Sequence, residues 1–172
     1  MANFTPIAFI DTFELAASLV PRMGMFKRGG GPFGVLPVKW AKDPEADAFT
    51  FVQAAELNKW PELRNTLSRI VRLGRSILGE LELGEISFTL LDPGVGVPWY
   101  SDSNAYRRAF LTLHLALRTN PDAMMISGTQ MAHLLPGALT LVNHRVPCSA
   151  INLGEHARIH LTIDFRKKEK TE

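Results

Sequence analysis

The sequence predicts a mainly β domain with a helical part toward its N-terminal end. From residue 83 onward, short apolar runs alternate with turn signals such as Asp92-Pro93-Gly94 and Pro136-Gly137. Several short strands at this spacing are typical of a β-sandwich or barrel. Before residue 83, the clearest pattern is instead a long segment with helical periodicity.

That segment, residues 61–78, is expected to form an amphipathic helix. Leu63 and Leu67 belong to a set of apolar residues that recur at helical spacing and form one face. Pro61 suits the first turn of a helix, and Gly79 suits its end. Such a helix can cover the apolar face of a sheet.

The strands are expected in short runs between turns, and two of them carry a strict alternation of side chains. The expected ranges are 35–38 (broken or at an edge because of Pro37), 85–91, 110–117, 123–127, 138–143, 149–152 and 157–165. In the last run Ile159 and Leu161 share one face, whereas Arg158 and His160 share the other. The polar face is expected either to meet water or to line a barrel mouth, where small ligands bind.

Length and composition favour one domain and argue against several classes of partner. The chain has 172 residues, 46% of them apolar, and a net charge of +2. A single domain is expected over 1–166, with an N-terminal part (1–82), a β core (83–166) and a charged tail (167–172). Near-balanced charge argues against nucleic acid as a partner, and the absence of a long apolar run argues against a membrane. Because residues 7–20 make a poor signal peptide, we expect a cytoplasmic protein. A homodimer stays open.

Several segments of the β core resemble a known family. They are Leu90-Leu91-Asp92-Pro93-Gly94-Val95-Gly96-Val97-Pro98-Trp99-Tyr100-Ser101-Asp102, then His114-Leu115, residues 135–144, residues 146–152 and residues 158–165. In order and spacing this stretch, roughly 85–166, resembles the aspartyl/asparaginyl β-hydroxylases, which are iron- and 2-oxoglutarate-dependent dioxygenases. The resemblance implies a double-stranded β-helix, that is, a cupin-like jelly roll.

The resemblance also implies a degenerate iron site. Tyr100 and Cys148 stand where the family has its two iron-binding histidines, and Asp102 stands at the carboxylate position. Because a facial triad needs two imidazoles and one carboxylate, no metal ligand and no cofactor are predicted. The alternative is that Fe(II) and 2-oxoglutarate are bound through other ligands, such as Asp102 with His114 or His144.

The part of the family motif that binds a carboxylate is better kept. Arg158 lies ten residues after Cys148 and matches the arginine that pairs with the far carboxylate of 2-oxoglutarate in the family. The family's second carboxylate-binding arginine falls on Thr112, unless Arg107 or Arg108 replaces it through a shifted register. A guanidinium on a polar strand face is suited to bidentate carboxylate binding. We therefore expect a carboxylate-bearing substrate.

The leading functional hypothesis is metal-independent acid/base chemistry: isomerisation, elimination or cyclisation. The candidate catalytic residues are Tyr100, Asp102, Cys148 and His114, and the candidate substrate-binding residues are Arg158, His160, Trp99 and Thr112. Ordinary structural roles compete with these: Cys148 as a packed core residue, Tyr100 as a rim aromatic, and each histidine as a hydrogen-bonded structural group. Two other functions stay open, an active Fe(II)/2-oxoglutarate hydroxylase and a non-catalytic relative that binds a ligand or a partner protein.

Overall fold

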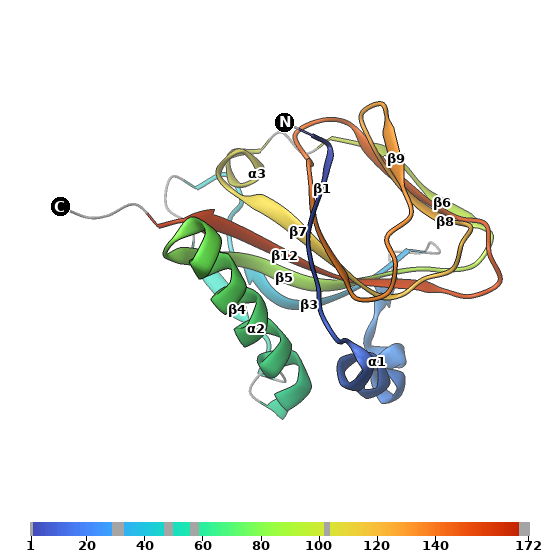
Figure 1. Cartoon of the computed structure of the whole chain (residues 1–172), viewed down its shortest axis with the longest axis horizontal. Helices are drawn as coiled ribbons and strands as arrows, with labels where there is room; N and C mark the ends of the chain where they lie inside the picture. Colours follow the sequence, from blue (N-terminus) through green and yellow to red (C-terminus); the bar gives the residue numbers. More distant parts are fainter. Residues whose placement is uncertain (1, 29–32, 47–49, 56–58, 102–103, 169–172) are drawn as a thin grey trace.

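The structure of the chain, a computed structural model, describes residues 2–28, 33–46, 50–55, 59–101 and 104–168 (Figure 1). The glycine-rich segment 29–32 and Asp102 lie outside these ranges. The elements in chain order are β1 (Phe4–Phe9), α1 (Phe13–Leu19), the 3-10 helix η1 (Val20–Met25), β2 (Lys27–Arg28), β3 (Phe33–Ala41), β4 (Phe51–Gln53), α2 (Pro61–Leu78), β5 (Leu81–Leu91), β6 (Val95–Tyr100), α3 (Ala105–Ala109), β7 (Leu111–Arg118), β8 (Ala123–Ser127), β9 (Gln130–Ala132), β10 (Ala138–Val142), β11 (Cys148–Asn152) and β12 (Arg158–Lys167).

Two antiparallel sheets make up the body of the molecule. The larger, eight-stranded sheet has the order β1-β10-β7-β12-β5-β3-β2, with β4 paired to β3. The smaller sheet has the order β6-β11-β8-β9. Strands that are distant in the chain are neighbours in both sheets, which is the arrangement of a jelly roll. The expected cupin-like, double-stranded β-helix is therefore confirmed.

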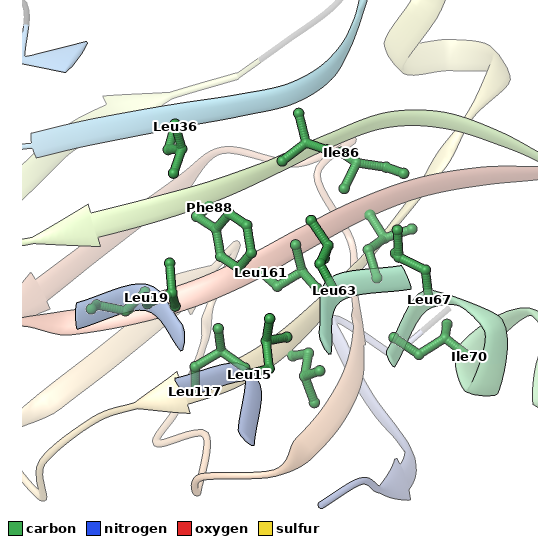
Figure 2. Packing of buried hydrophobic residues seen from close by; sticks show 14 of the residues in the cluster. Leu15, Leu19, Leu36, Leu63, Leu67, Ile70, Ile86, Phe88, Leu117 and Leu161 are labelled. Atoms are coloured by element: carbon green, nitrogen blue, oxygen red, sulfur yellow. The ribbon is translucent and has the colours of Figure 1, made fainter. Parts of the chain in front are cut away.

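The hydrophobic core lies between the larger sheet and the helices α1 and α2. Leu63 and Leu67 of α2 and Leu15 of α1 are buried against Phe88 and Leu161 of the sheet (Figure 2). Packing of this kind stabilises an amphipathic helix that would be marginal on its own. No helix in the described ranges is long and apolar enough to cross a membrane.

The N-terminal part contributes strands as well as helices. Helix α2 covers 61–78 as the periodicity predicts, and Gly79 ends it in a backbone conformation with φ of 85°. The predicted strand at 35–38 is the middle of the longer β3, which pairs with β5 along one side. On its other side, β2 pairs with Gly34 and Val35 and β4 pairs with residues 39–41. Pro37, which has no N–H, falls in the gap between these two partners.

Strands β7 and β12 have the alternation that the sequence predicts. Their leucine and isoleucine side chains face the helical core, and Leu115 and Leu161 are fully buried there. The opposite face carries Thr112, His114 and Arg158, and it looks toward the smaller sheet. Of the two arrangements that the pattern left open, helices cover the apolar face and the polar face lines an internal cavity.

Candidate functional site

A cavity of about 570 Å³ lies between the two sheets. One wall comes from the polar face of β3, β5, β7 and β12, and the other comes from β6, β8 and β11. A cavity of this size suits a small organic molecule. Five of the sequence-predicted site residues line it: Trp99, Tyr100, Thr112, His114 and Arg158.

Arg158 is a buried cation at this cavity. It begins β12, where the register sets it opposite Leu91 of β5, and it is only 3% exposed. Its Nε and Nη1 atoms are buried and have no hydrogen-bond partner among the residues that the structure describes. Burial lowers the pKa of Arg158 to about 10, so the guanidinium stays charged at neutral pH. A buried charge without a partner is costly, and an anionic ligand would relieve that cost.

Two histidines meet at the same cavity. His114 lies on β7, and His144 lies in the loop between β10 and β11. Their rings are stacked, and the Nε2 atoms are 2.9 Å apart, which is hydrogen-bond distance. The Oη atom of Tyr100 lies 3.4 Å from Nδ1 of His144. The three side chains therefore form a row of polar atoms along the cavity wall.

Both imidazoles are neutral at physiological pH. Burial lowers the pKa of His144 to about 4, and the charge of Arg107 adds to this effect. Burial also lowers the pKa of His114 well below its usual range, with smaller contributions from His144 and His160. A neutral imidazole has one donor and one acceptor nitrogen, so one Nε2 of the pair carries the shared hydrogen. Either ring can be the donor, depending on its tautomer.

A second arginine at the cavity is already paired. Arg107 of α3 donates to Asp164 through Nη1 at 2.6 Å and to Glu85 through Nη2 at 3.3 Å. Thr112 and Tyr106 also donate to Asp164, at 2.6 Å and 3.0 Å. Burial raises the pKa of Asp164, whereas Arg107 and the two hydroxyl donors oppose this rise. Thr112, predicted to bind substrate, thus donates to a carboxylate of the protein itself.

The rest of the lining is largely apolar. Phe33 and Val35 of β3, Val97 of β6 and Met125 of β8 contribute to it. Trp99 is 59% exposed and also lines the cavity, which places it at the rim. An aromatic side chain in this position can pack on the body of a bound molecule.

Two predicted site residues that the structure describes, Cys148 and His160, are not among those that line the cavity. Cys148 is fully buried, its Sγ donates to the carbonyl oxygens of Asn143 and Val146, and it is not among the described residues that line the cavity. His160 is buried on the same face of β12 as Arg158 and lies edge-on to His114, with ring centroids 5.7 Å apart. Asp102 lies outside the described residues.

Four residues that the sequence hypothesis left out of the candidate site list contribute to the cavity lining. His144 and Arg107 entered only as alternatives, and Glu85 and Asp164 were not singled out, yet all four line the cavity. Asp164 shares the polar face of β12 with Arg158, so the alternation offered a signal for it. Glu85 has no such distinguishing signal in the sequence.

The jelly roll and the order of the motifs along the chain agree with a match to a known family. The sequence model described as Aspartyl/Asparaginyl beta-hydroxylase matches residues 43–168. The chain belongs to the aspartyl/asparaginyl β-hydroxylase family. The family match extends well beyond the segments 85–166 that carry the resemblance in sequence, and it includes α2. No curated protein matches the chain.

Solved structures share this family member's fold at low sequence identity. A 2OG-Fe(II) oxygenase-family oxidoreductase from Burkholderia pseudomallei has a TM-score of 0.72 at 10% identity, covering 96% of this chain and 85% of that one. A prolyl-4-hydroxylase from Pseudomonas putida has a TM-score of 0.58 at 18% identity, covering 97% and 94%. The non-heme alpha-ketoglutarate-dependent epimerase from nogalamycin biosynthesis has a TM-score of 0.64 at 14% identity, covering 96% and 76%.

The iron that these names imply does not find a full ligand set in the described residues of this β-hydroxylase-family chain. The Nε2 atoms of His114 and His144, 2.9 Å apart, have the separation of two neighbouring ligands on one metal ion. However, no group of three His, Cys, Asp or Glu side chains converges within the described ranges. The donors found there are two imidazoles and a phenol, which do not make a facial triad.

Proposed function

We propose that this family member catalyses proton transfer, without a metal ion, on a small molecule that carries a carboxylate. The observation that carries the proposal is the meeting of two kinds of group at one cavity. Arg158 is a buried guanidinium whose Nε and Nη1 atoms have no hydrogen-bond partner in the part of the chain that the structure describes, and His114 and His144 are neutral imidazoles in hydrogen-bond contact. The first can hold a carboxylate and the second can accept and return a proton.

The row Tyr100–His144–His114 supports proton movement at the cavity wall. In one tautomer pair, His144 donates its Nε2 hydrogen to His114. In the other, His114 is the donor, and Nδ1 of His144 carries a hydrogen that faces Tyr100 Oη at 3.4 Å. A proton taken from substrate carbon at one end of the row can thus be returned from the other end. Isomerisation and cyclisation need only such a balanced transfer, with no oxidant.

Proton exchange in heavy water tests this proposal directly. The probe is phenylpyruvate, a carboxylate whose C3 hydrogens are acidic; one C3–H bond breaks and one C3–D bond forms. With a chelator present, we expect the wild-type protein to accelerate deuterium incorporation, measured by NMR. His114→Gln and His144→Gln should each slow it by about 100-fold or more, since general acid–base catalysis contributes about 10²- to 10⁴-fold. His156→Gln, an exposed histidine, is the control.

Metal analysis of the purified protein separates the proposal from its main alternative. We expect no stoichiometric iron and no Fe(II)-dependent consumption of 2-oxoglutarate. Stoichiometric iron, together with 2-oxoglutarate consumption that His114→Gln and His144→Gln abolish, would overturn the proposal. That result would favour the hydroxylase that the sequence left open, with these two histidines as ligands.

A further inference from the structure

The charged groups of the cavity indicate how many carboxylates its ligand carries. The described charged residues that line it are Glu85, Arg107, Arg158 and Asp164. Arg107 is held by both acids, through ion pairs of 2.6 Å to Asp164 and 3.3 Å to Glu85. Arg158 forms none with the described residues, and its Nε and Nη1 atoms are buried without a hydrogen-bond partner there. The lining thus offers one cation for one external anion.

A second carboxylate on the ligand would meet an unfavourable surface. To reach Arg107 it would have to displace Asp164 or Glu85 and then lie beside both of their charges. Thr112, at the position of the family's second carboxylate-binding arginine, already donates to Asp164 at 2.6 Å. Like charges in close proximity repel, and a displaced buried acid loses its hydrogen bonds.

The remaining surface suits an apolar body. Phe33, Val35, Val97 and Met125 line the cavity from three strands, and Trp99 stands at the rim. Burying apolar ligand area against such a wall is favourable, and a flat ring can also stack on Trp99.

From these observations we infer that the cavity selects a monocarboxylate with an apolar or aromatic body over a dicarboxylate, with Arg158 as the anion site and Glu85 and Asp164 as the groups that reject a second carboxylate. The inference rests on the proposed function and names its substrate class. It also separates this chain from family members that take the dicarboxylate 2-oxoglutarate.

Calorimetric titration with three unreactive probes tests the inference. We expect 3-phenylpropanoate to bind at least about 10-fold more tightly than glutarate and than 3-phenylpropanamide, since a charge-assisted hydrogen bond contributes about 1.5–3 kcal/mol, or roughly 10- to 100-fold. Arg158→Gln should remove the preference for the acid over the amide. Arg166→Gln, which alters an arginine outside the cavity lining, should keep it.

The rejecting groups are tested with a matched pair of variants on β5. Glu85 pairs with Arg107 at the cavity. Glu82 instead pairs with Arg166, with 2.8 Å between their charged groups, and neither residue lines the cavity. Glu85→Gln should raise the affinity for glutarate by about 10-fold relative to 3-phenylpropanoate, because Arg107 then has less negative charge around it. Glu82→Gln should leave the ratio unchanged.

Three adverse outcomes have different meanings. Tighter binding of glutarate than of 3-phenylpropanoate, with loss of both in Arg158→Gln, would overturn the inference and leave the carboxylate site of the proposed function intact. No Arg158-dependent binding of any of these acids would overturn both. A glutarate affinity that Glu85→Gln does not raise would overturn the role of the rejecting acids.

Discussion

At the scale of single residues, the site is defined by polar groups that the fold buries at a cost. Arg158 is 3% exposed with two unpaired nitrogen atoms, and His114 is 4% exposed with its Nδ1 unpaired among the described residues. Buried polar groups in folded proteins are normally hydrogen-bonded. Side chains that break this rule at one cavity are readily explained by a ligand that completes their bonds.

Arg158→Met tests whether this arginine serves the ligand or the fold. Because methionine fills similar space without a buried charge, we expect the ligand-free variant to be more stable by about 1–3 kcal/mol. Urea denaturation of the ligand-free protein measures this change. A lower stability of Arg158→Met would show that the guanidinium supports the fold. Arg166→Met serves as the comparison, since Arg166 pairs with Glu82 and lies over the Phe110 ring, so its loss should cost about 0–1 kcal/mol.

At the scale of elements, strand β5 joins the core to the paired acids of the cavity. Tyr106 of α3 packs over Gly84, donates from Oη to Asp164 at 3.0 Å and accepts from the backbone N–H of Glu85 at 2.5 Å. A Cβ atom at Gly84 would lie 2.2 Å from that Oη and 2.7 Å from the ring of Phe110. Helix α3 can therefore pack in this position only because residue 84 has no side chain.

Gly84→Ala should consequently destabilise the protein. Since Tyr106 or the strand must shift, we expect a loss of about 1–3 kcal/mol in the free energy of unfolding, together with weaker anchoring of Arg107. Thermal unfolding of the variant measures this loss. Gly24→Ala is the control, because nothing lies within 4 Å of a Cβ atom there. Equal stabilities of the two variants would contradict the packing described for α3.

The elements that the sequence predicted are those with a long, one-sided pattern. Helix α2 spans five turns with one apolar face, so its range could be read directly, and β12 alternates as far as Phe165, so the expected strand 157–165 covers most of the observed Arg158–Lys167. Strand β1 and helix α1 are too short for a period to be distinguished within one apolar run. Strand β6 contains Gly96 and Pro98, which disfavour strands, and the structure accommodates them at the edge of the smaller sheet.

The positions of the candidate site residues could be predicted only in part, for a related reason. Arg158, Thr112 and His114 are fixed by strand alternation and by the family motif, and all three line the cavity. His144 lies in a loop and Arg107 lies on the short helix α3, where no period constrains side-chain direction. Their places depend on how distant strands pack, so the sequence could offer them only as alternatives.

At the scale of the whole molecule, the hydrophobic core and the candidate site occupy opposite faces of the larger sheet. One face packs on α1 and α2, and the other holds the cavity, and none of the described residues that line the cavity belongs to the main core cluster. The cavity face nevertheless makes the stability of the protein depend on pH, because it buries histidines in their neutral form. His114, His144 and His160 all have pKa values below their usual range, with burial as the largest cause and nearby arginines adding to it.

This shift sets the sign of the pH dependence of folding. An unfolded histidine takes up a proton below about pH 6.5, whereas these buried imidazoles stay neutral, so the unfolded chain binds more protons as the pH falls. Their stabilising contribution is therefore fully present above pH 6.5 and declines below it, for His144 until about pH 4. Each histidine that stays neutral in the folded protein should lower the free energy of unfolding by about 1.4 kcal/mol for each unit by which the pH falls in this window.

Urea denaturation at pH 7.5 and pH 5.5 measures the effect, and we expect a markedly lower midpoint at pH 5.5. In His144→Gln the difference between the two midpoints should be smaller by about the contribution of one histidine, because glutamine does not titrate. His156→Gln, an exposed site, should retain the full difference. If the midpoint is the same at both pH values, or if the two variants behave alike, then His144 is not held neutral by burial. The proton-transfer role proposed for the pair would then be limited to higher pH, since His144 would be protonated below about pH 6.5 and could not accept a proton from His114 or from substrate there.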